Sequence, residues 1–353
     1  MRVLFDLGHP AHYHLYKNAI KYLKTRNDDI LIVVRNRENM VADLLREDGE
    51  NFVILGENVK GLTQKSLYLV RNDIKLLQIA SKFRPDLFVS MSSPYSSHIA
   101  FLLRRPHLSF TDTEISKLIL FLLAPFTKPM ITPTSFTGEF NFRKHIKIDS
   151  YKELAYLHPK YFEPDPGILE NLDLRKGEKY MIVRFSAFDA SHDTGLKGLT
   201  TQSKIELVKR LTEISKVFIC SEVTLPDDLR DLELQIPPGQ MHNLLGHAAL
   251  YIGEGAVMAS EAALLGIPSI FLNPSKRGYL EELKQMGLVT HYMRPEEELD
   301  DIFNHVQRII SSDSVKEDIS KRREEMLIKK KDLTALLISE IEKIRLRTGK
   351  KVN

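Results

Sequence analysis

The sequence predicts an α/β protein made of two Rossmann-like domains, each built on a parallel sheet. The chain of 353 residues is too long for one ordinary hydrophobic core. Its length suits two domains of roughly 150–200 residues each. Short apolar runs alternate with segments of helical spacing, which is the pattern of βαβ units. The alternation stops near residue 150 and restarts near residue 179. Two βαβ halves joined by one connector are the simplest account of the chain.

The first half, residues 1–150, is expected to form the N-terminal domain. Its strands are predicted from short runs rich in apolar, β-branched and aromatic residues, at 2–7, 30–34, 52–55, 87–91 and 107–110. Its helices are predicted from apolar residues at helical spacing, at 15–23, 41–45, 97–103 and 115–123.

Residues 151–178 are rich in proline and aromatic residues and are expected to be a connector. The second domain is expected over residues 179–330. Its strands are predicted at 180–185, 217–220, 234–236, 250–252 and 269–272, and its helices at 204–214, 241–248, 257–265 and 279–286. Residues 331–353 are expected to form a charged C-terminal helix that packs back toward the N-terminal domain.

Charge and cysteine content exclude several classes of protein. The 50 basic and 47 acidic residues give a formal net charge of +3, which is no electrostatic footprint for nucleic acid. The basic tail from Lys329 to Lys351 is interpreted as a solvated helix face. The single cysteine, Cys220, allows no intramolecular disulfide and no cysteine-based zinc site. A reducing compartment, and hence a cytoplasmic protein, is expected.

The sequence contains no predicted membrane span. Its longest apolar stretch, residues 118–126, is far shorter than the roughly 20 residues that a spanning helix needs. We expect this stretch to be a buried helix. The alternative is a membrane-surface patch, so membrane contact is expected to be peripheral at most.

Polar residues follow two predicted strands of the first half. Gly8, His12 and His14 come directly after the first strand, where parallel sheets usually bind ligands. Histidines there can act as base or proton donor near neutral pH, or can cap and pack the helix. Asp112 follows the strand at 107–110 and is either a second candidate base or a helix cap. No metal site is predicted from this cluster.

A long polar loop follows the first strand of the second half. Arg184 stands at the strand end, and Ser186 and His192 follow in the loop. The planar guanidinium of arginine suits bidentate contact with phosphate, so these residues are candidates for binding a diphosphate. The alternative is a surface loop in which Arg184 pairs with a neighbouring carboxylate.

The most specific motif is the block from Gly253 to Ile270. It combines a predicted strand, a Gly-x-Gly turn, a helix with Glu261, and a Gly-x-Pro turn. Gly253 and Gly255 leave backbone amides, such as that of Ala256, at a helix N-terminus that attracts phosphate. Glu261 is a candidate acceptor for ribose hydroxyls. Upstream, Met241 and His242 begin a helix and are candidates to contact the base or ribose.

This block resembles the donor-site signature of the GT-B superfamily, which includes MurG-like glycosyltransferases and UDP-N-acetylglucosamine 2-epimerases. The Gly8-His9-Pro10-Ala11-His12 loop resembles the acceptor-side loop of the same superfamily. The closest resemblance is to an uncharacterised GT-B-like family. It implies a GT-B fold, with two Rossmann-like domains facing a central cleft and the acceptor side on the N-terminal domain. Glu254, between the two glycines, departs from the MurG-like pattern.

The resemblance implies a metal-independent glycosyltransferase with a nucleoside diphosphate sugar as donor, a UDP-sugar being the first choice. No other cofactor is expected, and the acceptor is left open between a glycan and a lipid-linked intermediate. Two alternatives stay open at this point. One is a UDP-sugar 2-epimerase on the same fold, and the other is a non-catalytic sugar-nucleotide-binding protein.

Overall fold

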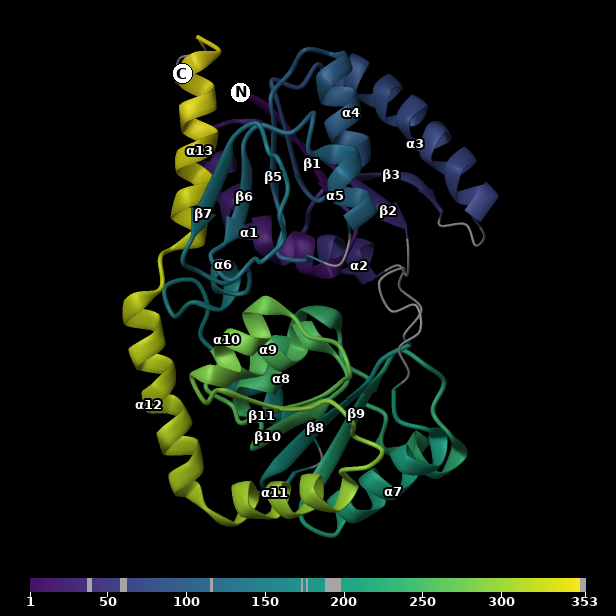
Figure 1. Cartoon of the computed structure of the whole chain (residues 1–353), viewed down its shortest axis with the longest axis vertical. Coiled ribbons are helices and arrows are strands. Elements are labelled where there is room, and N and C mark those ends of the chain that lie inside the picture. Colours follow the sequence, from purple (N-terminus) through teal and green to yellow (C-terminus); the bar gives the residue numbers. More distant parts are fainter. Residues whose placement is uncertain are drawn as a thin grey trace. The chain divides into compact units, whose positions relative to one another are not determined.

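The computed structural model of the chain describes residues 1–36, 40–57, 62–114, 117–172, 174–175, 177–187 and 198–349 (Figure 1). The chain divides into two compact units. Unit 1 comprises residues 1–156 together with 331–353, and unit 2 comprises residues 157–330. The chain thus leaves unit 1 after Tyr156 and returns to it at Lys331.

The described part of unit 1 is built on a seven-stranded parallel sheet with the order β3-β2-β1-β4-β5-β6-β7. The order reverses direction at β1, which is the arrangement of a doubly wound sheet. The strands are β1 (Arg2–Leu7), β2 (Asp29–Asn36), β3 (Phe52–Glu57), β4 (Leu87–Met91), β5 (His107–Phe110), β6 (Met130–Pro133) and β7 (His145–Ile148).

Helices cover both faces of this sheet (Figure 1). Leu76 of α3 and Ile99 of α4 pack with Leu4, Val33 and Phe88 of the sheet in one apolar core, while α1 packs against α2 and α13. Burial on both faces explains why β1 and β4 are almost continuously apolar. The helices are α1 (Pro10–Thr25), α2 (Met40–Glu47), α3 (Leu62–Phe83), α4 (Pro94–Leu102), α5 (Lys117–Leu123), α6 (Leu154–Leu157) and α13 (Leu333–Arg347).

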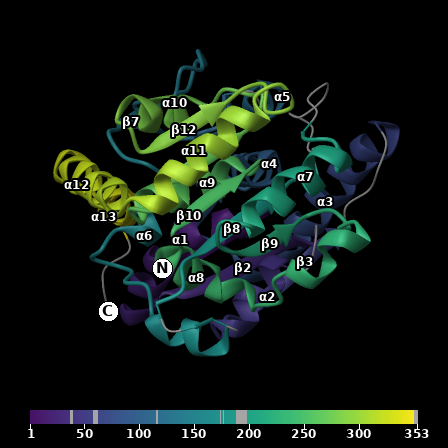
Figure 2. The same cartoon turned by 90° about the horizontal axis from the view of Figure 1, so that it is seen from below.

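The described part of unit 2 is built on a five-stranded parallel sheet with the order β12-β11-β10-β8-β9 (Figure 2). Its strands are β8 (Tyr180–Phe185), β9 (Lys216–Ser221), β10 (Leu250–Gly253), β11 (Ser269–Leu272) and β12 (Val289–Tyr292). Its α-helices are α7 (Thr201–Thr212), α8 (Met241–His247), α9 (Ala256–Leu264), α10 (Gly278–Gln285), α11 (Leu299–Ser311) and α12 (Asp313–Lys329). Apolar residues of α7 and α11 pack on one sheet face in a single core cluster.

Three short 3₁₀ helices complete unit 2: η1 (Pro166–Asn171), η2 (Asp227–Leu232) and η3 (Pro238–Gln240). The predicted α/β class, with two Rossmann-like parallel sheets, is confirmed. The strand predicted at residues 234–236 is wrong, because Glu233 forms only an isolated bridge with Ile219 and no ladder continues it.

The elements without a predicted counterpart include α3, α6, β6, β7 and β12. The three strands have only four residues each and include polar residues or proline. Their pairing with β5, β6 and β11 makes them strands, and such long-range pairing leaves little local signal.

Two basic residues of the tail are buried in ion pairs, which corrects the interpretation of the tail as a solvated face. Arg345 on α13 forms a bidentate pair with Asp28, with an Nη1–Oδ1 distance of 2.9 Å. The amino group of Met1 lies 2.5 Å from the same carboxylate. Lys330, which follows α12, lies 2.6 Å from Glu282 within unit 2. Among the described residues, no helix has the length and apolarity needed to cross a membrane.

Candidate functional site

The carboxyl ends of β8 and β10 in unit 2 meet at Arg184 and Gly253. These two residues are direct partners in the parallel ladder. A Cβ atom on Gly253 would lie 2.5 Å from the carbonyl oxygen of Arg184, closer than any side chain allows. Glycine at this position therefore permits the close approach of the two strands, and the Glu254 amide donates to the same Arg184 carbonyl at 2.9 Å.

The turn after β10 delivers the N-terminus of α9 to this edge. Gly255 is the N-cap residue, and no side chain of the described residues caps the helix there. The first residues of α9, beginning with Ala256, are half-buried. A Cβ on Gly255 would lie 3.2 Å from Cγ of Arg184, so the arginine stem lies against the turn. Uncapped backbone amides and the helix dipole make such an end attractive to an anion.

The Glu254 carboxylate, which departs from the MurG-like pattern, is compensated within unit 2. Its Oε2 accepts from the amide of Ser186 at 2.9 Å, and its Oε1 accepts from that of Leu199 at 2.7 Å. Lys204 Nζ lies 3.4 Å from Oε2. Burial raises the pKa of Glu254, while Lys204 and the two amides oppose the rise. Glu254 thus joins the β8 and β10 loops instead of presenting an uncompensated charge.

Arg184 has an acidic partner in this structure. Its Nη2 lies 2.5 Å from Oε1 of Glu222, and the other Glu222 oxygen accepts from the Ala187 amide at 3.1 Å. The salt-bridged alternative considered from sequence is therefore present, and a phosphate contact stays a prediction. Ser186 lies at the same edge, and its backbone amide donates a hydrogen bond to the Glu254 carboxylate. His192 lies outside the described residues.

Glu261 and His242 form a buried pair between α9 and α8. His242 Nε2 lies 2.9 Å from Oε1 of Glu261, and both side chains are less than a tenth exposed. The ring of Phe162 meets His242 edge-on, with centroids 6.0 Å apart. Met241 contacts Cys220 through their sulfur atoms at 4.0 Å. The structure thus joins two predicted ribose-site residues, whereas Met241 lies in a sulfur contact.

In unit 1, two of the three histidines after β1, His9 and His12, form hydrogen bonds within their own turn. His9 caps α1, because its Nδ1 accepts from the Ala11 amide at 3.1 Å. His12 accepts from the Gly8 amide at 3.2 Å and is partly exposed. His14 is buried, and its ring lies 5.1 Å from that of Tyr156. The capping role considered for His12 and His14 thus falls to His9, the packing role is present for His14, and roles in catalysis stay predictions.

A buried network under this turn escaped the sequence analysis. Asp6 of β1 accepts from Ser96 Oγ at 2.8 Å and also from Ser93 Oγ. Arg35 Nε lies 3.4 Å from Asp6. Ser93 also caps α4 by accepting from the Ser96 amide. The only local signal was an aspartate inside an apolar strand, since its partners come from other strands and helices.

Asp112 is also buried and paired. Its Oδ2 lies 2.9 Å from Lys152 Nζ, and its Oδ1 accepts from Thr113 Oγ1 at 3.0 Å. Lys152 is 3.4 Å from Glu153 as well, and all three ionic side chains are almost fully buried. Lys152 lay in the predicted connector, so sequence reasoning gave no reason to join it to Asp112. Within the described part of the chain, no three His, Cys, Asp or Glu side chains gather as a metal site.

A family model described as "Protein of unknown function (DUF354)" matches residues 1–344. One curated relative is an uncharacterised protein of Methanocaldococcus jannaschii, MJ0665. It is 25% identical over 291 residues, which cover 78% of this chain and 82% of the relative. The chain belongs to the DUF354 family.

Solved structures share its fold over nearly the whole chain. The spinosyn forosaminyltransferase SpnP is 17% identical, with a TM-score of 0.66, and the match covers 98% of this chain and 99% of that one. Staphylococcus aureus MnaA, in a co-structure with UDP, is 11% identical, with a TM-score of 0.70 over 100% and 98% of the two chains. A Listeria monocytogenes protein assigned to the UDP-N-acetylglucosamine 2-epimerases is 13% identical, with a TM-score of 0.65 over 91% and 90%. The predicted GT-B fold is confirmed.

Proposed function

We propose that this member of the DUF354 family is a nucleotide-sugar-dependent glycosyltransferase that binds the donor diphosphate at the turn between β10 and α9. The observation that carries the proposal is the N-terminus of α9 at Gly255, which no described side chain caps and against which the stem of Arg184 packs. Helix amides and an arginine fork both favour a phosphate at such a place. The solved structures of similar fold support the class of ligand, since their names include a sugar transferase and a UDP complex.

The same groups suit the chemistry of sugar transfer. When the glycosidic bond to the diphosphate breaks, negative charge grows on the leaving phosphate. The positive end of α9 and the Arg184 guanidinium would stabilise that charge without protonation of the leaving group. Arg184 would exchange Glu222 for the diphosphate, and the pair that it would leave is partly exposed.

Glu261 and His242 are proposed to bind the ribose. A carboxylate accepts hydrogen bonds from vicinal hydroxyls, and a histidine that touches it holds it in one orientation. Their 2.9 Å contact and their burial give the pair a fixed geometry, with Glu261 on the helix that begins at the proposed phosphate turn and His242 on α8.

The acceptor base is proposed to come from unit 1, with His12 as the first candidate. His12 is partly exposed at the carboxyl end of β1, where a sheet of this type binds ligands. His14 and Asp112 are weaker candidates, because one packs on Tyr156 and the other pairs with Lys152. The acceptor itself stays open between a glycan and a lipid-linked intermediate.

A UDP-sugar 2-epimerase is the second candidate, favoured by the match to the Listeria monocytogenes protein. The two reactions differ in their products. A transferase releases nucleoside diphosphate and needs an acceptor, whereas a 2-epimerase inverts one carbon of the sugar.

The first test is a thermal-shift screen of the whole chain against UDP, GDP, ADP, CMP, dTDP and their sugar conjugates. A ligand at about 100 times its dissociation constant stabilises the fold by about 2.7 kcal/mol, which is a measurable rise in Tm. Glu261→Ala should abolish the rise, and Glu297→Ala, an exposed carboxylate on the same unit, should keep it. No rise with any nucleotide would overturn the proposal.

The second test is turnover of the conjugate that binds, in buffer with EDTA. Release of nucleoside diphosphate that depends on an added acceptor supports the transferase. A change at carbon 2 seen by NMR supports the epimerase. Binding with neither change identifies a non-catalytic sugar-nucleotide-binding protein.

A further inference from the structure

Three neighbouring helices of unit 1 carry an exposed apolar patch. The patch comprises six side chains, each between 54% and 72% exposed: Val70, Ile74, Phe101, Leu102, Leu118 and Phe121. They come in pairs from α3, α4 and α5, which lie on one face of the sheet (Figure 1). Single exposed apolar side chains are common on soluble proteins, but a gathering of six calls for a binding partner.

Contacts between the helices hold the three elements of this patch side by side. His98 of α4 bonds Asp73 of α3 through Nδ1 at 3.2 Å and the Leu122 carbonyl of α5 through Nε2 at 3.4 Å. The ring of Phe126, just after α5, lies 4.9 Å from that of Phe101 and 5.4 Å from that of His98. The central helix is therefore held to both neighbours beneath the exposed side chains.

The surface around the patch is basic. Between residues 70 and 128 the sequence has eight lysines and arginines but four acidic residues. Three of the acids are already engaged: Asp73 bonds His98, Asp86 accepts from the Arg2 amide, and Asp112 pairs with Lys152. Four cations next to the patch are exposed: Arg104, Arg105, Lys117 and Lys128.

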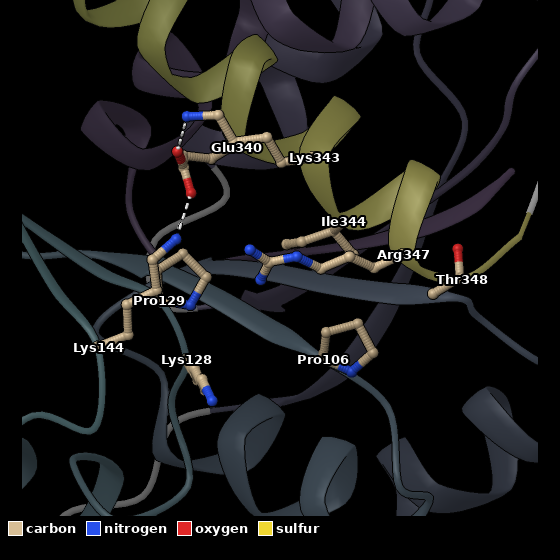
Figure 3. A pocket seen from close by; sticks show the side chains of 9 residues that line it. All are labelled: Pro106, Lys128, Pro129, Lys144, Glu340, Lys343, Ile344, Arg347 and Thr348. Atoms are coloured by element: carbon tan, nitrogen blue, oxygen red, sulfur yellow. Dashed lines mark hydrogen bonds and ion pairs between the residues drawn. The ribbon is translucent and has the colours of Figure 1, made fainter.

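The basic surface continues into a pocket at the amino ends of β5, β6 and β7 (Figure 3). The pocket has a volume of about 240 Å³, and Lys128, Lys144, Lys343 and Arg347 contribute to its lining. Glu340 binds Lys144 at 2.7 Å and Lys343 at 2.6 Å. Among the described residues, Lys128 and Arg347 have no acidic partner, so the pocket keeps positive charge that suits a phosphate group.

From these observations we propose that the apolar patch and its basic border bind the surface of an anionic phospholipid bilayer. Exposed leucine and phenylalanine side chains enter the interface between headgroups and acyl chains, while lysine and arginine bind the anionic headgroups. The contact is peripheral and does not depend on a nucleotide.

Charge complementarity selects the membrane over a second copy of the chain. A two-fold dimer would place the same patch against itself, so the basic borders of two copies would face each other and repel. An anionic bilayer matches both the apolar centre and the positive border.

The test is co-sedimentation of the full chain with vesicles of phosphatidylcholine alone, and of phosphatidylcholine with phosphatidylglycerol. We expect binding to the mixed vesicles that is weakened by salt and is at least about tenfold weaker without the anionic lipid. Leu118→Ser/Phe121→Ser should weaken binding by about tenfold or more. Ile328→Ser, which changes an 85% exposed apolar residue of unit 2, should leave it unchanged.

The role of the basic border is tested with separate charge-reversal variants. Arg104→Glu/Arg105→Glu should abolish binding to the anionic vesicles, whereas Lys209→Glu/Arg294→Glu, a matched reversal of exposed cations on unit 2, should not. All of these positions are exposed, so circular dichroism and Tm should show intact folding.

Equal binding to both kinds of vesicle, or none to either, would overturn the proposal. So would a dimer in analytical ultracentrifugation that Leu118→Ser/Phe121→Ser converts to monomer, since a second copy would then cover the patch. Because no nucleotide is added, failure of the donor-site proposal leaves this result unaffected.

Discussion

Helices α1 and α4, which follow central strands of unit 1, begin differently from α9, which follows β10 of unit 2, although α7 after β8 is capped by Thr200. In unit 1, α1 is capped by His9 and α4 by Ser93. In unit 2, α9 starts at Gly255, and no described side chain caps it. Both units therefore present a helix N-terminus at a sheet edge, but in unit 1 a side chain already accepts from one amide of each of these two helices.

The acidic groups near these edges are buried and compensated in both units. In unit 1, Asp6 and Asp112 are buried with Arg35 and Lys152 and hold loops together. In unit 2, the carboxylate of Glu254 is compensated beside the turn, so the amides of α9 stay available. We infer that the polar residues after the strands of unit 1 serve stability, whereas those of unit 2 serve the proposed donor site.

The largest expected effect is on the stability of unit 1. Lys152→Met leaves Asp112 and Glu153 buried without their cation, which should lower the free energy of unfolding by about 3–5 kcal/mol. Urea unfolding followed by circular dichroism measures it. Lys209→Met, at an exposed ion pair, should change it by less than about 0.5 kcal/mol.

Asp112→Asn removes the charge that Lys152 compensates, and it therefore tests whether Asp112 has a structural or a catalytic role. If it abolished turnover while stability and nucleotide affinity stayed intact, Asp112 would be a catalytic base and the structural role assigned to it in unit 1 would be wrong.

A buried histidine should make unit 1 sensitive to acid. His107 bonds Ser90 and Thr127, and burial lowers its pKa from 6.5 to about 3. The unfolded chain therefore binds a proton that the folded chain does not. The contribution of neutral His107 to the free energy of unfolding is fully present above pH 6.5. It falls toward pH 3, by up to about 1.4 kcal/mol per pH unit.

Hydrogen exchange in β4 and β5 at pH values between 7.5 and 5 would measure this loss. His107→Gln should flatten the dependence in these strands and leave that of β8 and β10 unchanged. An equally steep dependence in the variant would assign it to other groups.

Glycine substitutions at the carboxyl edges of the two sheets should have different effects on stability and nucleotide binding. A Cβ at Gly253 meets the backbone of Arg184 at 2.5 Å, whereas a Cβ at Gly8 meets only the far end of the Arg35 side chain. We expect Gly253→Ala to cost about 1–3 kcal/mol of stability and to remove nucleotide binding. Gly8→Ala should cost less, because a flexible side chain can move, and should leave nucleotide binding intact. Tm values with and without nucleotide measure the stability and the nucleotide binding of each variant. Equal losses of nucleotide binding in the two variants would contradict the placement of the donor site in unit 2.

The smallest expected effect is the change in nucleotide affinity when Arg184 loses its acidic partner. Glu222→Gln removes its acidic partner, and partly exposed pairs contribute little. We therefore expect nucleotide affinity to rise by about two- to threefold. Isothermal titration calorimetry measures the change. A fall in affinity would mean that Glu222 positions Arg184 instead of competing with the diphosphate.

The elements with strong local signals were predictable. β1, β4, β5 and β8 match the predicted ranges, because strands buried on both faces are rich in apolar residues. The Gly253–Gly255 turn was also readable, since glycine is needed where two strands approach closely. The sequence by itself thus determined the fold class, the family resemblance and the position of the donor-site candidates.

Only the tertiary structure decided which polar groups are engaged. Lys152 lies 40 residues from Asp112 in the chain, and Arg345 lies 317 residues from Asp28. Such pairs leave no periodic signal, because their geometry depends on how distant elements pack. The short strands β6, β7 and β12, the compensation of Glu254 and the exposure of Leu118 and Phe121 were likewise decided by tertiary packing, which determines the pairing and burial of each group.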